Sequence, residues 1–334
     1  MPSREVRIGA PPSKPFALRV IVVTAGASTT LEATLRSVLA CRRPAQLREV
    51  IVVENGARRH AEAAVRSLAS SGLAGGLPVR YEHVVRAGKS LALNHAIGLL
   101  GEGDLAVMTD DDVVVDPGWL EAYAAAASAF PEGHFFGGSF GVLREVEPAP
   151  EIAVWLPRSA MGVDLPEGTV DEPVYLGFNW AVWASDLRAC GGFDPNIGPG
   201  GALCDSGDET EVQRCLLSMG LRGRNVPAAR VDHRVPARKI TPEWLRSRYL
   251  HFGRQLAYRT SRHEGRRSRG LTHAKVALAG MLGRAGLTWR RLTGGPPSFR
   301  ARRDVEIARG YREGLAFLNH RAARSVSTSH PQTE

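Results

Sequence analysis

The strongest constraint on the fold is a repeated alternation of short apolar runs and helix-like stretches over the first 110 residues. The runs FALRVIVVT (16–24), REVIVVENG (48–56), PVRYEHV (78–84) and DLAVMTD (104–110) predict strands. Between the first two runs, apolar residues recur at helical spacing from Leu31 to Leu39, and further helices are expected near 59–70 and after Lys89. Strand–helix–strand units of this kind predict an α/β fold with a mostly parallel sheet and helices on both faces.

Beyond residue 130 the sequence becomes rich in glycine, proline and aromatic residues. Strands are predicted within 134–142, 173–184 and 223–233, and a helix over about 209–219. From Pro242 onward the apolar spacing predicts a helical appendage. The expected organisation is a flexible segment 1–15, a main domain 16–237 with halves of about 16–130 and 131–237, a basic helical region 238–325 and a frayed tail 326–334.

Positive charge is concentrated near the C-terminus. Residues 238–334 contain 21 Lys and Arg against six Asp and Glu, whereas the whole chain has a net charge of +9. This indicates contact with an anionic surface or, equally, a solvated arginine-rich helical face. The most apolar late segment, 271–289, is interrupted by charged residues, so we expect a soluble or peripheral cytoplasmic protein. The four widely spaced cysteines predict reduced thiols.

Carboxylates are predicted to gather where the strands end. In a parallel sheet, ligands bind beyond the carboxyl ends of the strands, and Asp110, Asp111 and Asp112 follow one such run. Asp110 and Asp112 are two residues apart, so their side chains can project to the same side while Asp111 points away. A divalent cation, Mg²⁺ or Mn²⁺, would relieve their repulsion, with substrate phosphates completing its shell. The competing role, capping the next helix, is assigned to Asp116.

Four sequence segments in the same order resemble the family 2 glycosyltransferases, which have the GT-A fold. They are VIVVT…LEATLRSVL, REVIVVENGA, RAGKSLALNHAI with MTDDDVVVDPGWLE, and YLGFNWAVWASDLRACGGFDPNIGPGG…GDETEVQRCLLSMG. The resemblance covers about residues 17–236. It implies a Rossmann-like sheet, a metal-dependent inverting glycosyltransferase using Mg²⁺ or Mn²⁺, and a nucleotide-diphospho-sugar donor. The first half would bind the donor and the second half the acceptor.

The resemblance also implies roles for individual residues. On the donor side it places Thr24, Glu54, Lys89, Asn94, Asp110 and Asp111. Glu54 stands where the family usually has an aspartate that contacts the base or ribose. Asp112, Asp110 and His233 would bind the metal, and Asn179 and Trp180 would line the acceptor side. Thr24 is followed by Ala25 and Gly26, where relatives commonly have an aromatic residue and an asparagine, so the nucleotide base stays open.

A second acidic cluster, CDSGDETEV, contains Asp205, Asp208, Glu209 and Glu211. Inverting relatives carry a Glu-Asp pair here, at the start of a helix, and this chain has the reversed order Asp208-Glu209. The resemblance makes Glu209 the general base and Asp208 its partner; a shift by one residue would exchange them. Favourable charge at a helix N-terminus would explain one acid, but not four within seven residues. The preceding GFDPNIGPGG suits a loop that closes over the donor.

Several alternatives stay open. The chain could be a catalytically inactive sugar-nucleotide binder or scaffold, or a sugar-phosphate nucleotidyltransferase, although TAGASTT lacks the basic residue expected of the latter. The helical region could rest on the inner face of a membrane, cap the sheet or form an oligomer. We do not expect nucleic-acid binding, because no such motif accompanies the charge. The donor sugar and the acceptor, whether lipid-linked saccharide, peptide or small metabolite, are not specified by the sequence.

Overall fold

The computed structural model describes residues 15–26, 30–295 and 298–327. The predicted flexible segment 1–15 and frayed tail 326–334 therefore lie almost entirely outside the described residues. The chain forms two compact units. Unit 1 comprises residues 1–145, 157–195 and 208–235, and unit 2 comprises residues 146–156, 196–207 and 236–334. Unit 2 thus includes two segments that the sequence analysis assigned to the main domain.

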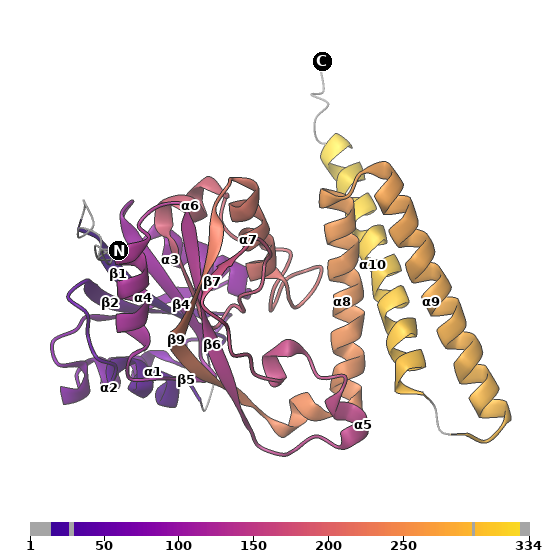
Figure 1. The fold of residues 1–334 in the computed structure, drawn as a ribbon, viewed down its shortest axis with the longest axis horizontal. Coiled ribbons are helices and arrows are strands. Elements are labelled where there is room, and N and C mark those ends of the chain that lie inside the picture. Colours follow the sequence, from indigo (N-terminus) through magenta and orange to yellow (C-terminus); the bar gives the residue numbers. More distant parts are fainter. Residues whose placement is uncertain (1–14, 27–29, 296–297, 328–334) are drawn as a thin grey trace, which may run out of the picture. The chain divides into compact units, whose positions relative to one another are not determined.

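Unit 1 is built on a mixed sheet with the strand order β3-β2-β1-β4-β8-β6-β9-β5, in which β7 pairs with β9 (Figure 1). Its first four strands are β1 (Ala17–Thr24), β2 (Leu47–Asn55), β3 (Val79–Val84) and β4 (Asp104–Asp110). All three pairings among them are parallel, as the sequence predicted for this part of the chain. Their carboxyl ends therefore lie along one edge of the sheet.

The remaining strands are β5 (Val113–Val115), β6 (His134–Arg144), β7 (Gly168–Val170), β8 (Trp180–Trp183) and β9 (Arg222–Val235). The strand β8 is antiparallel to β4 and β6, and β9 is parallel to β6 but antiparallel to β5 and β7. Of the strand predicted within 173–184, only Trp180–Trp183 (β8) is extended. The chain turns just before it, where Asn179 N donates to Leu176 O at 3.0 Å.

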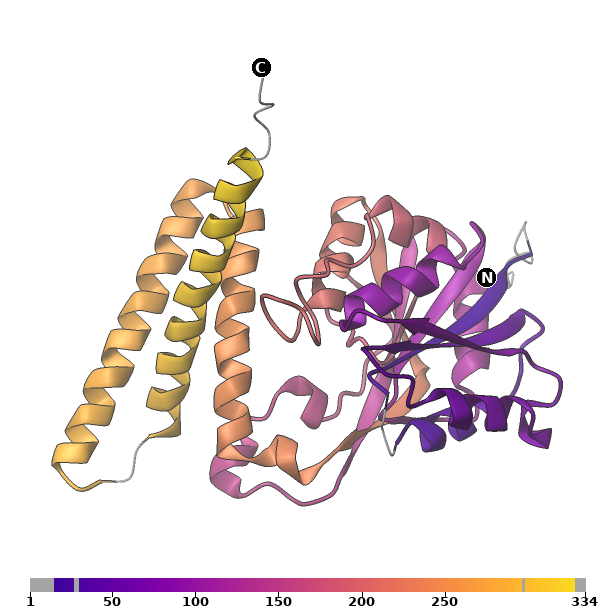
Figure 2. The same cartoon turned by 180° about the vertical axis from the view of Figure 1, so that it is seen from behind.

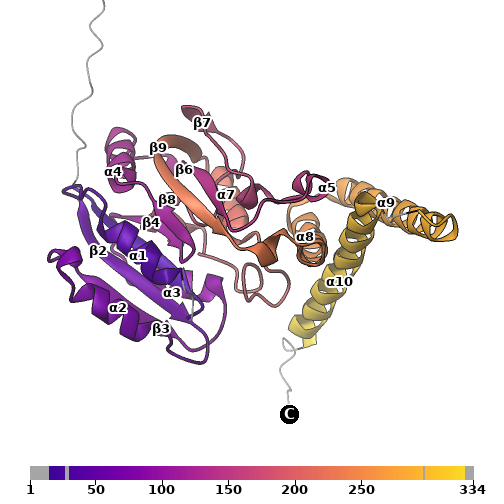
Figure 3. The ribbon, with the colours of Figure 1, turned by 90° about the horizontal axis from the view of Figure 1, so that it is seen from below.

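Helices cover both faces of this sheet. One face carries α1 (Leu31–Leu39), α2 (Glu62–Ala69) and α4 (Trp119–Ala129), and the other carries α3 (Lys89–Gly98), α6 (Ala184–Ala189) and α7 (Asp208–Ser218). Figure 3 shows α4 and α7 on opposite sides of the strands. Alternation along β1 explains the two layers, because Val20 and Val22 face the first set while Ile21 and Val23 face the second.

The start of α4 differs from the prediction. Gly118 occupies the N-cap position, with no capping side chain, and the Asp116 main-chain carbonyl accepts from Trp119 N at 3.0 Å. Asp116 therefore supports this helix through its backbone. Short 3₁₀ turns occur at Gly72–Ala74, Arg158–Ala160 and Ala237–Ile240.

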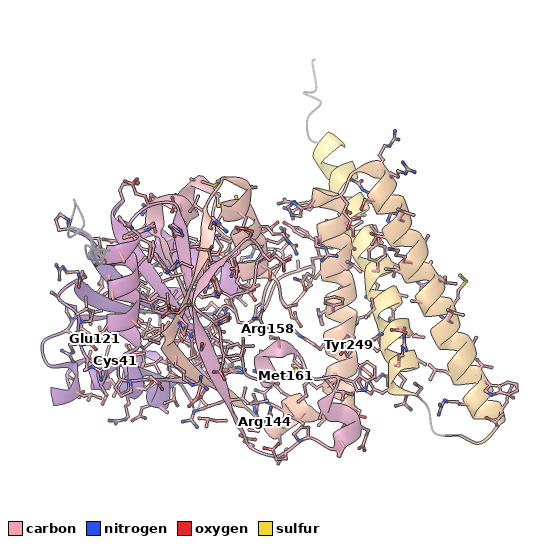
Figure 4. All side chains as sticks on the ribbon, in the orientation of Figure 1. Cys41, Glu121, Arg144, Arg158, Met161 and Tyr249 are labelled. Carbon is pink, nitrogen blue, oxygen red and sulfur yellow. The ribbon has the colours of Figure 1, made fainter. Side chains whose placement is uncertain are left out.

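Unit 2 consists mainly of three long helices, α8 (Pro242–His263), α9 (Arg266–Leu292) and α10 (Phe299–Ser327), which run side by side in Figure 2. Its segment 146–156, with the short α5 (Pro150–Ala153), is held by Tyr249, labelled in Figure 4, whose hydroxyl donates to Trp155 O at 2.8 Å. The segment 196–207 packs Ile197, Leu203 and Cys204 against Tyr258 of α8. The GFDPNIGPGG stretch is thus partly anchored to α8.

Glycines let α8 and α10 approach closely. A Cβ added at Gly310 would lie 1.9 Å from Leu250 O, and one at Gly253 would lie 2.2 Å from Ile307 O. Beside this contact, Arg246 pairs with Glu306 at 2.9 Å and Arg254 with Glu313 at 2.6 Å. The absence of side chains at the crossing therefore sets the distance at which these ion pairs form.

Gly310→Ala is expected to destabilise unit 2, because the new methyl group overlaps a main-chain oxygen and the helices must separate. We expect a loss of about 1–3 kcal/mol, measured by helix-sensitive circular dichroism during urea unfolding. The matched control is Gly270→Ala on α9, where an added Cβ meets nothing within 4 Å. This control should stabilise by about 0.5–1 kcal/mol, through reduced backbone entropy. Equal effects of the two substitutions would contradict the close approach.

Candidate functional site

Three consecutive acids at the end of β4 contact three different partners. Asp110 forms an ion pair with Lys89. Asp111 Oδ2 accepts a hydrogen bond from Thr24 Oγ1 at 2.5 Å, and Asp112 Oδ2 lies 3.4 Å from His233 Nε2. The three acids therefore have three separate side-chain partners, and that of Asp110 is an ammonium group.

Lys89, the first residue of α3, links the two acidic clusters that the sequence analysis identified separately. Burial alone would lower its pKa, but the charges of Asp110, Asp208 and Glu209 outweigh burial and raise the pKa above its ordinary value. A Cβ added at Gly177 would lie 3.0 Å from Lys89 Nζ and 3.8 Å from Glu209 Oε2. The acids of β4 and α7 thus meet around one buried ammonium group.

Asp208 and Glu209 occupy the first turn of α7. Asp208 is 2% exposed, and its Oδ2 atom has no hydrogen-bond partner among the described residues. Burial raises the pKa of Glu209, and the charge of Asp208 raises it further, while the charge of Lys89 opposes the shift. A carboxyl group shifted in this direction is suited to accept or donate a proton near neutral pH.

The other two acids of that cluster lie elsewhere. Asp205 belongs to unit 2, where its Oδ2 is 3.0 Å from His251 Nε2, and Glu211 pairs with Arg214 at 2.9 Å. Only Asp208 and Glu209 therefore join the Lys89 cluster.

His233, on β9, is held in a defined orientation beside Asp112. Its Nδ1 lies 2.8 Å from Ser159 O, and its ring stacks on Phe178 with centroids 4.6 Å apart and an interplanar angle of 5°. Because a carbonyl oxygen can only accept, Nδ1 carries the hydrogen, and in the neutral ring the Nε2 lone pair faces the Asp112 carboxylate. A cation between these two acceptors would be liganded by both, so the pair fits a divalent metal.

Asp112 and His233 would supply two ligands of a metal coordination shell. Within residues 15–26, 30–295 and 298–327, no group of three or more His, Cys, Asp or Glu side chains is placed to hold a metal ion. Such a two-ligand site would need phosphate oxygens or water to complete the shell.

Glu54 is fully buried at the end of β2, with both carboxylate oxygens satisfied within the chain. It accepts hydrogen bonds from His60 N at 2.7 Å, Ala61 N at 3.0 Å and Tyr81 Oη at 2.6 Å. Two of these donors are main-chain amides just before α2, so Glu54 stabilises the start of that helix. The same arrangement favours glycine at position 26, because a Cβ at Gly26, where φ is +105°, would lie 2.6 Å from Glu54 Oε1.

Contacts inside the protein already involve the side chains of Asn94, Asn179 and Trp180. The Asn94 amide exchanges two 2.8 Å hydrogen bonds with the main chain of Phe193. The Asn179 amide is fully satisfied in the core: it accepts from Trp119 Nε1 and Tyr123 Oη and donates to Ser139 O and Ala229 O, all at 2.8 Å. Trp180 is 1% exposed. The expected acceptor-side residues Asn179 and Trp180 are thus placed in the core.

Two residues not singled out by the sequence analysis contribute to the site. Gly177 gives the space in which Lys89 and Glu209 approach, and Phe178 supports the His233 ring. Their only sequence signal is their position immediately before the Asn179-Trp180 pair.

Asp111 provides a pH-dependent test of this geometry. Burial raises its pKa to about 6, with contributions from the charges of Asp112 and Asp110, although the Thr24 hydrogen bond opposes the shift. The unfolded carboxyl loses its proton first, so stability falls as pH rises from about 4 through about 6.

Asp111→Asn should remove this fall, so that the variant gains stability over the natural protein as pH rises through that window. The measurement is the melting temperature between about pH 4 and 7. Glu102→Gln, at a side chain that is 83% exposed, is the control and should follow the natural protein. A constant difference between Asp111→Asn and the natural protein across the window would contradict the buried placement.

Comparisons with known proteins agree with this architecture. The sequence profile described as Glycosyl transferase family 2 matches residues 19–182. The mannosyltransferase PcManGT from Pyrobaculum calidifontis, in complex with GDP-Man and Mn²⁺, is similar in fold at 20% identity and a TM-score of 0.53, over 92% of this chain and 89% of that chain. GalNAc-T7 with UDP, GalNAc and Mn²⁺ is similar at 15% identity and a TM-score of 0.51, over 73% of this chain.

This chain spans about half, 51%, of the length of GalNAc-T7. No curated protein sequence gives a significant match. The strand order and the acids beyond β4 are nevertheless consistent with the family that the matched sequence region indicates. Residues 19–182 of this chain therefore form a family 2 glycosyltransferase domain, and its fold is GT-A.

Proposed function

We propose that the protein is a metal-dependent inverting glycosyltransferase that moves a sugar from a nucleotide-diphospho-sugar to an acceptor hydroxyl. The observation that carries this proposal is the convergence of the acids of β4 and α7 on Lys89, within a family 2 glycosyltransferase fold. The complexes of PcManGT with GDP-Man and of GalNAc-T7 with UDP support the donor class.

Asp112 and His233 are the side chains that would hold Mg²⁺ or Mn²⁺, with donor phosphate oxygens and water completing the shell. When bound, the cation supplies positive charge to the departing diphosphate. Lys89 adds a second positive charge beside Asp110, and it can neutralise phosphate charge on the same side. Thr24 fixes Asp111 through a hydrogen bond, which keeps the end of β4 ordered.

Glu209 is the proposed general base. It accepts the proton of the acceptor hydroxyl as the new bond to the anomeric carbon forms and the bond to the diphosphate breaks. A single displacement of this kind inverts the anomeric configuration. The charge of Asp208 raises the pKa of Glu209, and Asp208 is proposed to orient the base.

Ligand-induced stabilisation tests the donor and metal roles. UDP-, GDP- and TDP-sugars should be tested by thermal shift with and without Mn²⁺, and saturation at about 100 times Kd corresponds to about 2.7 kcal/mol. Asp112→Asn and His233→Ala should each abolish the metal-dependent part of the shift. Asp171→Asn, whose side chain is 70% exposed, should leave it unchanged. If no sugar nucleotide stabilises the natural protein in the presence of Mn²⁺, the proposal fails.

Glu209→Gln is expected to lower kcat for sugar transfer or donor hydrolysis by about 10²–10⁴-fold, because the amide cannot accept the proton. In the natural protein, activity should fall as pH falls, since Glu209 becomes protonated. Lys89→Met should move this fall to higher pH by removing the charge that lowers the Glu209 pKa. Glu211→Gln, in the same turn, is the control and should keep near-normal activity.

The relative effects of the two acids decide the assignment. A complete loss in Asp208→Asn together with an active Glu209→Gln would exchange their roles. A protein that binds sugar nucleotides with Mn²⁺ but shows neither transfer nor hydrolysis would be an inactive binder.

A further inference from the structure

The helix α9 carries an apolar stripe that is exposed to solvent. Six of its large apolar residues are more than half exposed: Leu271 58%, Leu278 54%, Met281 60%, Leu282 64%, Trp289 68% and Leu292 78%. On a helix that turns about 100° per residue, they fall within an arc of about 100°. From Leu271 to Leu292 this stripe is about 30 Å long. Isolated exposed apolar residues are common, but a continuous stripe indicates a binding surface.

The opposite side of α9 already packs against α10. A Cβ added at Gly280 would lie 2.5 Å from Ala308 Cβ, and one at Gly283 would lie 2.8 Å from Ala301 O. These glycines lie roughly opposite the stripe on the helix. Figure 4 shows side chains projecting from α9 on the side away from α10. The packing of unit 2 therefore does not account for the stripe.

The charge of α9 indicates which kind of partner the stripe can bind. Its 27 residues contain six arginines and one lysine, with no aspartate or glutamate. Arg267, Lys275, Arg284 and Arg291 are all exposed. On the helical projection Arg267 lies within the arc of the stripe and Lys275 lies beside it, so two copies of α9 packed through their stripes would bring like charges into the contact, which disfavours a second copy as the partner. A partner that is apolar inside and anionic at its boundary is complementary to both the apolar stripe and the positive charges of α9.

We propose that α9 is a peripheral membrane-docking helix that lies in the plane of an anionic lipid bilayer. The stripe would enter the boundary between headgroups and acyl chains, while arginine and lysine side chains contact lipid phosphates. Trp289 suits this boundary because its ring is apolar and its indole nitrogen is a hydrogen-bond donor. The negatively charged cytoplasmic leaflet is a surface of this kind. This inference rests on unit 2 and is independent of the proposed reaction.

Docking on the surface agrees with the dimensions of the helices. Across the described part of the chain, no helix is both long enough and apolar enough to cross a membrane. The exposed large apolar side chains of α9 lie on one side of the helix, and its glycine side is occupied by α10. The expected attachment is therefore reversible and sensitive to salt.

Vesicle sedimentation of the whole protein tests the proposal. The protein should bind vesicles of phosphatidylcholine mixed with phosphatidylglycerol, and bind pure phosphatidylcholine vesicles weakly. The double variant Leu278→Glu, Leu282→Glu should reduce the partition coefficient by about tenfold or more, because apolar contact is lost and acidic groups face anionic lipid. Val154→Glu is the matched control: it introduces the same acidic group at a residue that is 73% exposed in the same unit, and it should bind normally.

A second pair of measurements keeps the test decisive if the leucine variant misfolds, which circular dichroism would reveal. Lys275→Glu with Arg284→Glu, and high salt with the natural protein, should each weaken binding to the mixed vesicles. Undiminished binding in either experiment would overturn the proposal, as would equal binding to pure phosphatidylcholine. If light scattering shows a dimer that Leu278→Glu dissociates, the stripe is an interface between copies and the proposal is wrong.

Discussion

The site depends on the attraction between one ammonium group and the carboxylates around it. Lys89 meets Asp110 from the end of β4 and lies in the field of Asp208 and Glu209 at the start of α7. Carboxylates buried together without a cation would repel one another, and each would be driven to bind a proton. The position of Lys89 at the start of α3 therefore allows strands and helices distant in sequence to place acids in the same small volume.

The fold could be predicted where the signal is local. The β-branched runs that form β1 to β4 alternate between two apolar faces, so their strand character and parallel arrangement follow from the sequence. The segment 173–184 was predicted less well, because its apolar residues resemble a strand throughout. Only Trp180–Trp183 forms one, since the chain turns at Asn179 and that side chain fixes main-chain atoms 40 and 50 residues away.

The sequence predicts those site residues that lie at the ends of strands or at the starts of helices. Asp110 to Asp112, Lys89 and the Asp208-Glu209 pair occupy such positions, and the structure brings their clusters together. Glu54 and Asn94 show the limit of this reasoning. Their partners are main-chain groups and side chains that only the folded chain supplies, such as Phe193, which is 99 residues from Asn94. A local motif contains no information about such partners.

The contact between His233 and Ser159 has a consequence for variation at this site. The atom that fixes the imidazole tautomer is a main-chain carbonyl oxygen, not the serine hydroxyl. Substitution of the residue at position 159 leaves that oxygen in the chain, so the orientation of the ring can persist when another amino acid takes this position. Inspection of aligned side chains would therefore overlook a determinant of the imidazole that the backbone itself encodes.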